Sequence, residues 1–163
     1  MVESIVSRGI QTTLIEQKDR VGGRIDKDIS RVLESYLKSQ GVNLILEDSV
    51  ENISGNKIQT IGGKILEGDL IIGAIGVVPN TDFLEGTGIE LSKEKAIKVN
   101  KYLETNVKDI YAIGDCVLSY LSITGEEIYM PLGSTANKMG RILGDRLTGG
   151  NLEFKGILGT LIL

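Results

Sequence analysis

The sequence has 163 residues, of which 41% are hydrophobic and 25% charged, a composition typical of a soluble globular protein. The net charge of −4 argues against a general nucleic-acid binder, which needs clustered Lys and Arg, and no apolar run approaches the roughly 20 residues of a membrane span. With no His and one Cys, the sequence lacks the usual general base near neutral pH and cannot form an internal disulfide, which fits a cytoplasmic location.

The first half of the chain predicts a strand–helix–strand unit. Helical spacing is present over residues 1–8 and 26–39, and short buried strands are predicted over 12–15 and 42–46. The longer helix presents one apolar face, made by Ile29, Val32, Leu33, Tyr36 and Leu37. This order is part of a βαβ pattern whose opening strand is expected ahead of the sequence.

Beyond residue 48 the pattern changes to short β runs. Residues 49–66 are interrupted by Gly55-Asn56 and Gly62-Gly63, which predicts an antiparallel meander. The apolar run 69–74 predicts a buried central parallel strand, and Pro79-Asn80 predicts a turn. The fold class predicted from these elements is α/β, with incomplete Rossmann-like three-layer dinucleotide-binding units and an antiparallel β-meander.

The second half begins with a surface segment over 82–95. Strands are predicted over 97–99 and 110–113, followed by a polar stretch. Pro131 is placed to begin a helix over about 132–148. The last residues, 156–163, form a strand-like apolar run.

Glu16 ends the first predicted strand. In a dinucleotide-binding unit, an acidic residue at the end of the second strand accepts hydrogen bonds from the adenosine ribose, about twenty residues after the glycine-rich turn that binds the pyrophosphate. That turn would lie ahead of Met1, so Glu16 taken alone is also compatible with an exposed charge. A carboxylate here favours NAD over NADP, while Lys18 and Arg20 either bind a 2′-phosphate or remain solvated.

The 21 glycines indicate either many tight turns or a backbone that approaches a phosphate-bearing cofactor. Gly76 follows an apolar run within the sequence AIGVVPN, and Gly114-Asp115 ends the sequence TNVKDIYAIGD over 105–115. The helix after Pro131 begins with backbone amides that have no intrahelical partner, at Leu132, Gly133 and Ser134.

The order of these motifs resembles the pyridine nucleotide-disulfide oxidoreductases, and within them the NADH oxidase, coenzyme A-disulfide reductase and NADH peroxidase branch. The resemblance implies three parts: residues 1–78 of an NAD-binding domain, 79–150 from the C-terminal part of an FAD-binding domain, and 151–163 at the start of a truncated dimerisation domain. It assigns Glu16 and Gly76 to NADH. It assigns the remaining site residues to FAD: Gly114, Asp115, Leu132, Gly133 and Ser134.

This resemblance implies part of a flavoprotein oxidoreductase that passes hydride from NADH to FAD and on to a disulfide or oxygen acceptor. The family's redox-active Cys belongs to a segment absent from this sequence. Cys116 has no second Cys or His to activate it, so it is expected to be a small packed residue and the chain alone to be inactive. The alternative is a non-catalytic nucleotide-binding or assembly module that pairs into a homo-oligomer. The expected partners are small-molecule dinucleotides, without nucleic acid or membrane.

Overall fold

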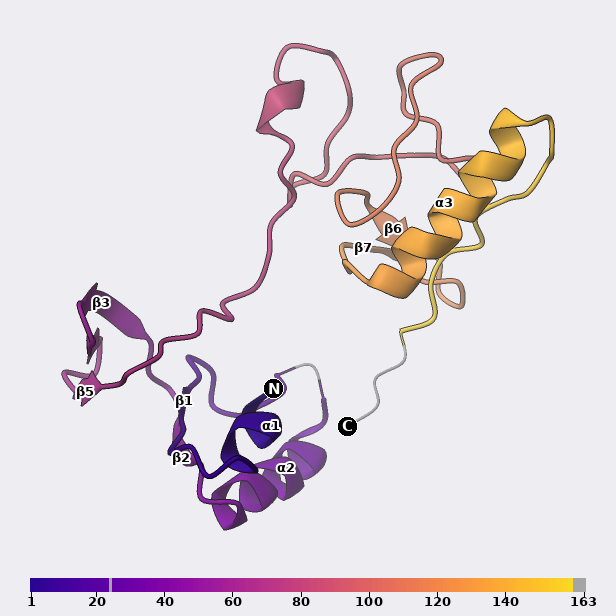
Figure 1. Cartoon of the computed structure of the whole chain (residues 1–163). Coiled ribbons are helices and arrows are strands. Elements are labelled where there is room, and N and C mark those ends of the chain that lie inside the picture. The colour runs from indigo at the N-terminus through magenta and orange to yellow at the C-terminus, as the bar shows by residue number, and fades with distance from the viewer. Residues whose placement is uncertain (24, 160–163) are drawn as a thin grey trace. The chain divides into compact units, whose positions relative to one another are not determined.

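The computed structural model describes residues 1–23 and 25–159, and the chain divides into two compact units, Met1–Ala74 and Ile75–Leu163 (Figure 1). The first unit contains α1 (Val2–Val6), β1 (Thr13–Ile15), α2 (Lys27–Ser39), β2 (Asn43–Ile45), β3 (Val50–Ser54), β4 (Lys57–Thr60) and β5 (Ile65–Glu67). The second contains the 3-10 helix η1 (Asp82–Leu84), β6 (Ser119–Tyr120), β7 (Glu127–Ile128) and α3 (Gly133–Leu147). The predicted α/β class is confirmed.

The strand–helix–strand unit predicted in the first half is also confirmed. β1 and β2 pair in parallel, with Leu14 opposite Leu44, and α2 makes the crossover that a parallel pair requires. Leu37 of α2 and Ile45 of β2 are buried. Because the two strands run in the same direction, their carboxyl ends lie at one edge, where the loop 16–26 begins.

The antiparallel meander predicted over 49–66 is confirmed as β3, β4 and β5. Ile58 of β4 lies opposite Ile53 of β3 and Leu66 of β5. Gly55 and Gly63 have φ of 62° and 80°, the left-handed backbone that favours glycine in tight turns. Local turn chemistry therefore places these three strands.

Asp48 is a buried carboxylate, 7% exposed, at the start of the meander. Its Oδ1 accepts the N–H groups of Ser49 and Gly62, each at 2.9 Å, and Lys64 Nζ lies 3.7 Å from its Oδ2. The Gly62 N–H is the largest cause that lowers the pKa of Asp48, reinforced by the side chain of Thr60. One ionised side chain thus ties the β4–β5 turn to the end of the parallel pair.

The buried face of α2 differs from the predicted one. Three of the predicted face residues are exposed, namely Ile29, Val32 and Tyr36. The buried residues of the helix are Ser30 and Leu37, and Leu33 and Glu34 are half-buried between them. These four positions have i, i+3, i+4 and i+7 spacing, so they form a single face. The helix turns this face inward because Ser30 and Glu34 bond the loop that follows β1.

The prediction of a buried central strand over 69–74 is wrong. These residues form no strand, and Leu70 and Ile72 are 78% and 47% exposed. An apolar run becomes a strand only where a neighbouring strand pairs with its backbone, and among residues 1–23 and 25–159 none pairs with this run. The apolar side chains that follow, Ile75, Val77 and Val78, are exposed as well.

The core of the second unit is built from scattered segments around one helix. Its buried cluster consists of Leu103, Val117, Met139, Phe154 and Ile157. The helix predicted over about 132–148 is confirmed as α3, and it ends where Gly149, with φ of 92°, donates its N–H to the carbonyl of Arg146 at 3.1 Å. Met139 places the middle of α3 in this core.

Three strand predictions in the second unit are corrected. Residues 97–99 contribute only isolated bridges at Ile97, and 110–113 contribute only a bridge at Tyr111. In the run 156–163, Ile157 forms one parallel bridge with Leu121, while 160–163 lie outside the described residues. The stretch predicted to be merely polar contains the β6–β7 hairpin. Each apolar run lacks a neighbouring strand that pairs with it along its whole length, so it forms single β-bridges and no ladder.

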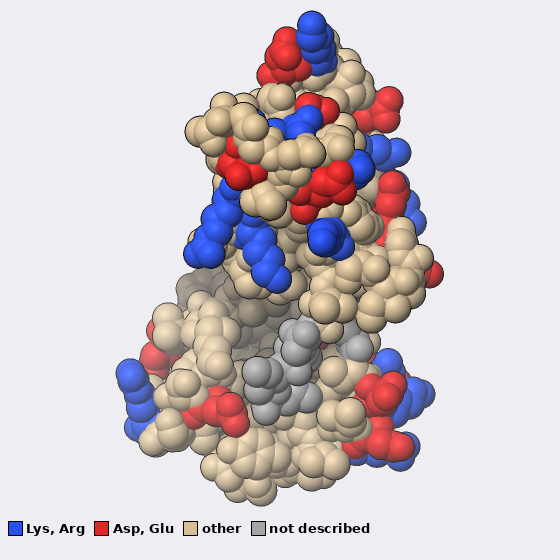
Figure 2. Space-filling view, turned by 90° about the vertical axis from the view of Figure 1, so that its right-hand side faces the viewer, with Lys and Arg blue, Asp and Glu red and all other residues tan. Residues whose placement is uncertain are grey.

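Across the described residues, 1–23 and 25–159, no helix combines the length and the apolar character needed to cross a membrane. The same residues contain no cluster of three or more His, Cys, Asp or Glu side chains that could bind a metal ion. On the face shown in Figure 2, Lys and Arg are interspersed with Asp and Glu, so the small net charge of −4 is spread over side chains of both signs.

Candidate functional site

Glu16 lies immediately after β1, at the edge where the parallel strands end. Its N–H donates to the carbonyl of Ile45 at 2.9 Å, which extends the pairing of β1 with β2 by one bond. Its half-buried carboxylate accepts the N–H of Lys18 at 3.0 Å. A carboxylate has about four lone-pair positions, so Glu16 retains capacity to accept further hydrogen bonds from hydroxyl groups.

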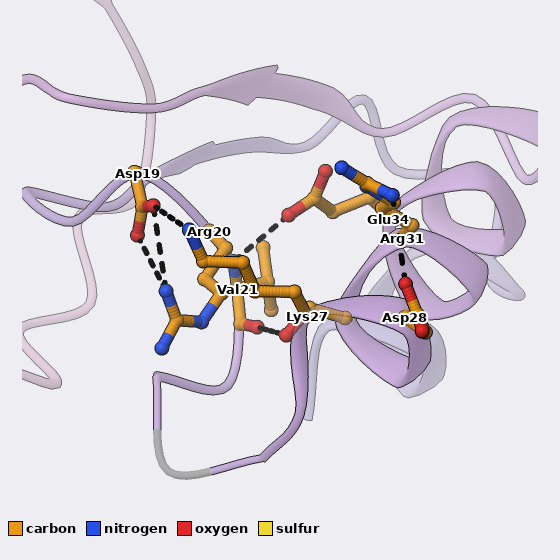
Figure 3. Close-up of polar contacts among 8 residues, drawn as sticks. Asp19, Arg20, Val21, Lys27, Asp28, Arg31 and Glu34 are labelled. Carbon is orange, nitrogen blue, oxygen red and sulfur yellow. Dashed lines mark hydrogen bonds and ion pairs between the residues drawn. The ribbon is translucent and has the colours of Figure 1, made fainter.

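The loop that follows Glu16 is anchored by α2 (Figure 3). Val21 donates its N–H to Glu34 Oε1 at 3.1 Å, and its carbonyl accepts the hydroxyl of Ser30 at 2.8 Å. Ser30 is fully buried. Neither side chain was predicted to bond this loop, although two polar residues four positions apart beside an apolar face are a usable signal in the sequence. α2 therefore fixes the loop backbone next to Glu16.

Lys18 and Arg20, the two cations considered for a 2′-phosphate, have different surroundings. Arg20 NH1 contacts both carboxylate oxygens of Asp19, at 3.0 and 3.4 Å (Figure 3). Lys18 lies against Gly23, where a Cβ would come within 2.7 Å of the Lys18 Cδ. The arginine is thus engaged by a carboxylate within its own loop.

Gly76 has φ of 99°, and a Cβ built there would meet no other atom within 4 Å. Its neighbours Ile75 and Val77 are 102% and 67% exposed. Gly76 belongs to the second unit and Glu16 to the first, so these two predicted NADH contacts are not brought together within one compact unit. The open backbone at Gly76 is compatible with close approach of a ligand.

Gly114 and Asp115 form a turn that packs against α3. Gly114 has φ of 91° and donates its N–H to the sulfur of Met139 at 3.4 Å. Asp115, the next residue, is exposed. Burial raises the pKa of Tyr129, and the charge of Asp115 raises it further. Asp115 can therefore accept hydrogen bonds at a position fixed by the core.

The first turn of α3 has no side-chain cap. Leu132 precedes the helix with extended backbone (φ −138°, ψ 124°), and its carbonyl accepts the N–H of Ala136 at 2.9 Å. Gly133 and Ser134 are exposed at the start of the helix. The unbonded amides of a helix N-terminus carry a partial positive charge, which stabilises an anion placed beside them. The structure thus places Gly114, Asp115 and residues 132–134 in one unit.

Cys116 follows Asp115 and is partly buried. Burial raises the pKa of its thiol, and the neighbouring charge of Asp115 acts in the same direction. Its Sγ donates to the carbonyl of Ile113 at 3.6 Å. A thiol that stays protonated near neutral pH is a weak nucleophile, so these surroundings do not activate Cys116.

A family model described as pyridine nucleotide-disulphide oxidoreductase matches residues 3–140. The NAD(P)H sulfur oxidoreductase (CoA-dependent) of Pyrococcus furiosus is 36% identical over 99% of this chain, and the coenzyme A disulfide reductase of Staphylococcus aureus is 32% identical over all of it. The chain spans 37% of the length of each of these curated relatives. The crystal structure of reduced Bacillus anthracis CoADR-RHD superposes with a TM-score of 0.91 at 35% identity, covering 99% of this chain and 29% of that one.

Proposed function

The chain belongs to the pyridine nucleotide-disulphide oxidoreductase family, and on that premise we propose that it forms part of a flavoprotein that passes hydride from NADH to FAD and on to a disulfide or oxygen acceptor. Its curated relatives carry the names of an NAD(P)H sulfur oxidoreductase and a coenzyme A disulfide reductase. FAD, when bound, accepts the hydride and passes the electrons on. This chain's residues bind and orient the two dinucleotides.

On the NADH side, Glu16 accepts hydrogen bonds from the adenosine ribose. The support is its position directly after β1, with its carboxylate oriented by the Lys18 N–H and the following loop fixed by α2. Gly76 lets the backbone approach the nucleotide without a side chain in the way. We assign residues 1–78 to the NAD-binding domain from the family resemblance, although the compact unit that contains Glu16 ends at Ala74.

On the FAD side, the observation that carries the proposal is the attachment of the Gly114-Asp115 turn to α3. This contact fixes an exposed acceptor, Asp115, in the same unit as the uncapped helix start at Leu132, Gly133 and Ser134. The carboxylate suits a ribityl hydroxyl, and the helix start suits negative charge on a reduced flavin. We assign 79–150 to the FAD-binding domain and 151–163 to the start of a dimerisation domain.

The test is the visible absorption spectrum of the purified chain after incubation with excess FAD and removal of unbound flavin. We expect Asp115→Asn to retain less flavin than the wild-type chain, because an amide is a weaker acceptor than a carboxylate. Asp109→Asn is the matched control, since Asp109 is exposed and its φ of 63° is one that Asn also adopts. A colourless wild-type chain, or equal retention by Asp115→Asn, would contradict the proposed FAD site.

The chain alone is expected to catalyse no hydride transfer to an acceptor. The glycine-rich turns that bind the pyrophosphate of each dinucleotide are not in this sequence, so both cofactors lose their main anchors, and burial raises the pKa of the one thiol, so Cys116 does not replace the family's redox-active Cys. NADH consumption with oxygen, disulfides or artificial acceptors measures this. Turnover above that of free flavin would show that the prediction is wrong.

A second candidate function is a nucleotide-binding or assembly module that pairs into a homo-oligomer. The exposed apolar run favours it, because Leu70, Ile75 and Val78 are between 78% and 102% exposed. We also propose a cytoplasmic location, where a single Cys stays reduced. Light scattering tests the assembly: a dimer or larger species is expected, and a monodisperse monomer would rule the module out.

A further inference from the structure

In the loop after β1, the backbone of residues 16–21 is fixed by hydrogen bonds at both ends. The Lys18 carbonyl accepts the N–H of Glu47 at 3.0 Å, and the Lys18 N–H is bonded to Glu16. Three residues later, Val21 is bonded to α2 through both its N–H and its carbonyl. Asp19 and Arg20 lie between these two anchored positions, so their side chains start from a defined place.

One carboxylate in this loop, that of Asp19, pairs with two cations (Figure 3). Asp19 Oδ1 lies 3.0 Å from Arg20 NH1, and Asp19 Oδ2 lies 3.9 Å from Lys27 Nζ. The side chain of Arg20 is only 26% exposed. Within the described residues its Nε–H has no acceptor, so the guanidinium keeps a donor that the loop does not satisfy.

We propose that Asp19 is a built-in counter-ion that withholds Arg20 from phosphate, and so determines that this loop prefers NADH to NADPH. The inference rests on the proposed function, because it needs the adenosine ribose to lie at Glu16. A guanidinium binds carboxylate and phosphate through the same kind of N–H donors, and here Asp19 occupies NH1 and offsets the positive charge that would attract a phosphate. The carboxylate of Asp19 therefore competes with a 2′-phosphate for Arg20.

This competition weakens the binding of NADPH and leaves the binding of NADH unaffected. A 2′-phosphate at this loop has to displace the Asp19 carboxylate from Arg20 and lie close to the second carboxylate, Glu16. The 2′-hydroxyl of NADH meets neither cost, because a hydroxyl donates to Glu16 and requires no cation. Arg20 and Lys27 thus form a potential phosphate-binding site that is blocked while Asp19 pairs with both cations.

The experiment follows binding by NMR on the 163-residue chain, through the loop amides and the Arg20 Nε–H signal. Its probes are 5′-AMP and adenosine 2′,5′-bisphosphate, which differ only in the 2′-phosphate, together with inorganic phosphate alone. In Asp19→Asn we expect the affinity ratio of the bisphosphate to 5′-AMP, and the affinity for inorganic phosphate, to rise about 1.4-fold to fivefold, the range set by a partly exposed ion pair. Asp19→Asn with Arg20→Gln should abolish the rise.

Asp69→Asn is the matched control, because Asp69 is exposed in the same unit and makes the same charge change after β5, outside the loop and α2. An unchanged ratio and phosphate affinity in Asp19→Asn, or an equal rise in Asp69→Asn, would overturn the inference. A rise in phosphate affinity without binding of either nucleotide would refute the ribose site at Glu16 and support the counter-ion role of Asp19.

Discussion

Phe154 allows a decisive test of whether the segment after α3 belongs to the core of the second unit. The side chain is 3% exposed and meets Tyr120 edge-on, with ring centroids 5.8 Å apart and an interplanar angle of 73°. Its N–H donates to the carbonyl of Lys101 at 2.8 Å, and its carbonyl accepts the Tyr120 hydroxyl. We therefore expect Phe154 variants to destabilise the whole unit.

The magnitude follows from what each variant removes. Phe154→Leu loses at least the edge-to-face contact, about 0.5–1.5 kcal/mol. Phe154→Ala leaves a cavity as well and costs about 3–5 kcal/mol. At roughly 0.05–0.15 kcal/mol per residue, the second unit, Ile75–Leu163, is stable by about 4–13 kcal/mol, so the Ala variant is expected to remove a large share of that stability.

Urea unfolding followed by tyrosine fluorescence suits this chain, because it has five Tyr and no Trp. Tyr36 is the only tyrosine in the first unit, so the signal reports mainly on the second. With a urea dependence of about 1–3 kcal/mol per M, Phe154→Leu should lower the midpoint by roughly 0.5 M. Leu158→Ala, four residues away and 65% exposed, is the control that should leave the midpoint unchanged.

A wild-type midpoint in Phe154→Ala would refute the reasoning. It would mean that residues 153–157 unfold independently and that Phe154 contributes nothing to the core formed with α3. Tyr120→Phe tests the same contact in a second way, because it keeps the pair of aromatic rings and removes only the hydroxyl that donates to the Phe154 carbonyl. We expect it to lower the free energy of unfolding by about 1 kcal/mol.

Three further predictions concern single polar groups. Asp48→Asn should speed amide hydrogen exchange at Gly62, because it weakens the acceptor of the Gly62 N–H. Folding lowers the pKa of Asp48, so the stability that its carboxylate provides is present above the unfolded pKa of about 4 and is lost as the pH falls through the folded pKa. Arg146→Gln removes a guanidinium 3.9 Å from the Tyr102 ring centroid, worth about 1 kcal/mol, and should lower the thermal midpoint by about 4–8 °C. Cys116 should react slowly with a disulfide reagent at neutral pH, because burial raises its pKa.

Each of these has a control within the chain. Asp69→Asn, at an exposed position of the first unit, should leave exchange at Gly62 unchanged. Arg141→Gln changes the same charge on the exposed side of α3 and should not move the thermal midpoint. For Cys116 the reference is the chain in denaturant, and a folded chain that reacts as fast as the denatured one would contradict the effect of burial.

The sequence by itself predicted the elements whose causes are local. α2 follows from helical spacing, α3 follows from Pro131 at its start, and the β3–β5 meander follows from the glycines at 55 and 63, whose positive φ its turns require. The candidate residues Glu16 and Asp115 were also identified locally, because Glu16 directly follows an apolar run and Asp115 follows one after Gly114. A carboxylate at the end of a predicted strand can be recognised from the sequence alone, without knowledge of its tertiary contacts.

Only the tertiary structure decided features that depend on a partner distant in sequence. Residues 69–74 are as apolar as a strand, yet a strand exists only where another backbone pairs with it. The inward face of α2 is set by the bonds of Ser30 and Glu34 to Val21, which outweigh the apolar spacing of Ile29, Val32 and Tyr36. For the same reason the engagement of Arg20 by Asp19 was not predicted: the sequence gives their charges, but the fixed loop backbone determines which donor faces which acceptor.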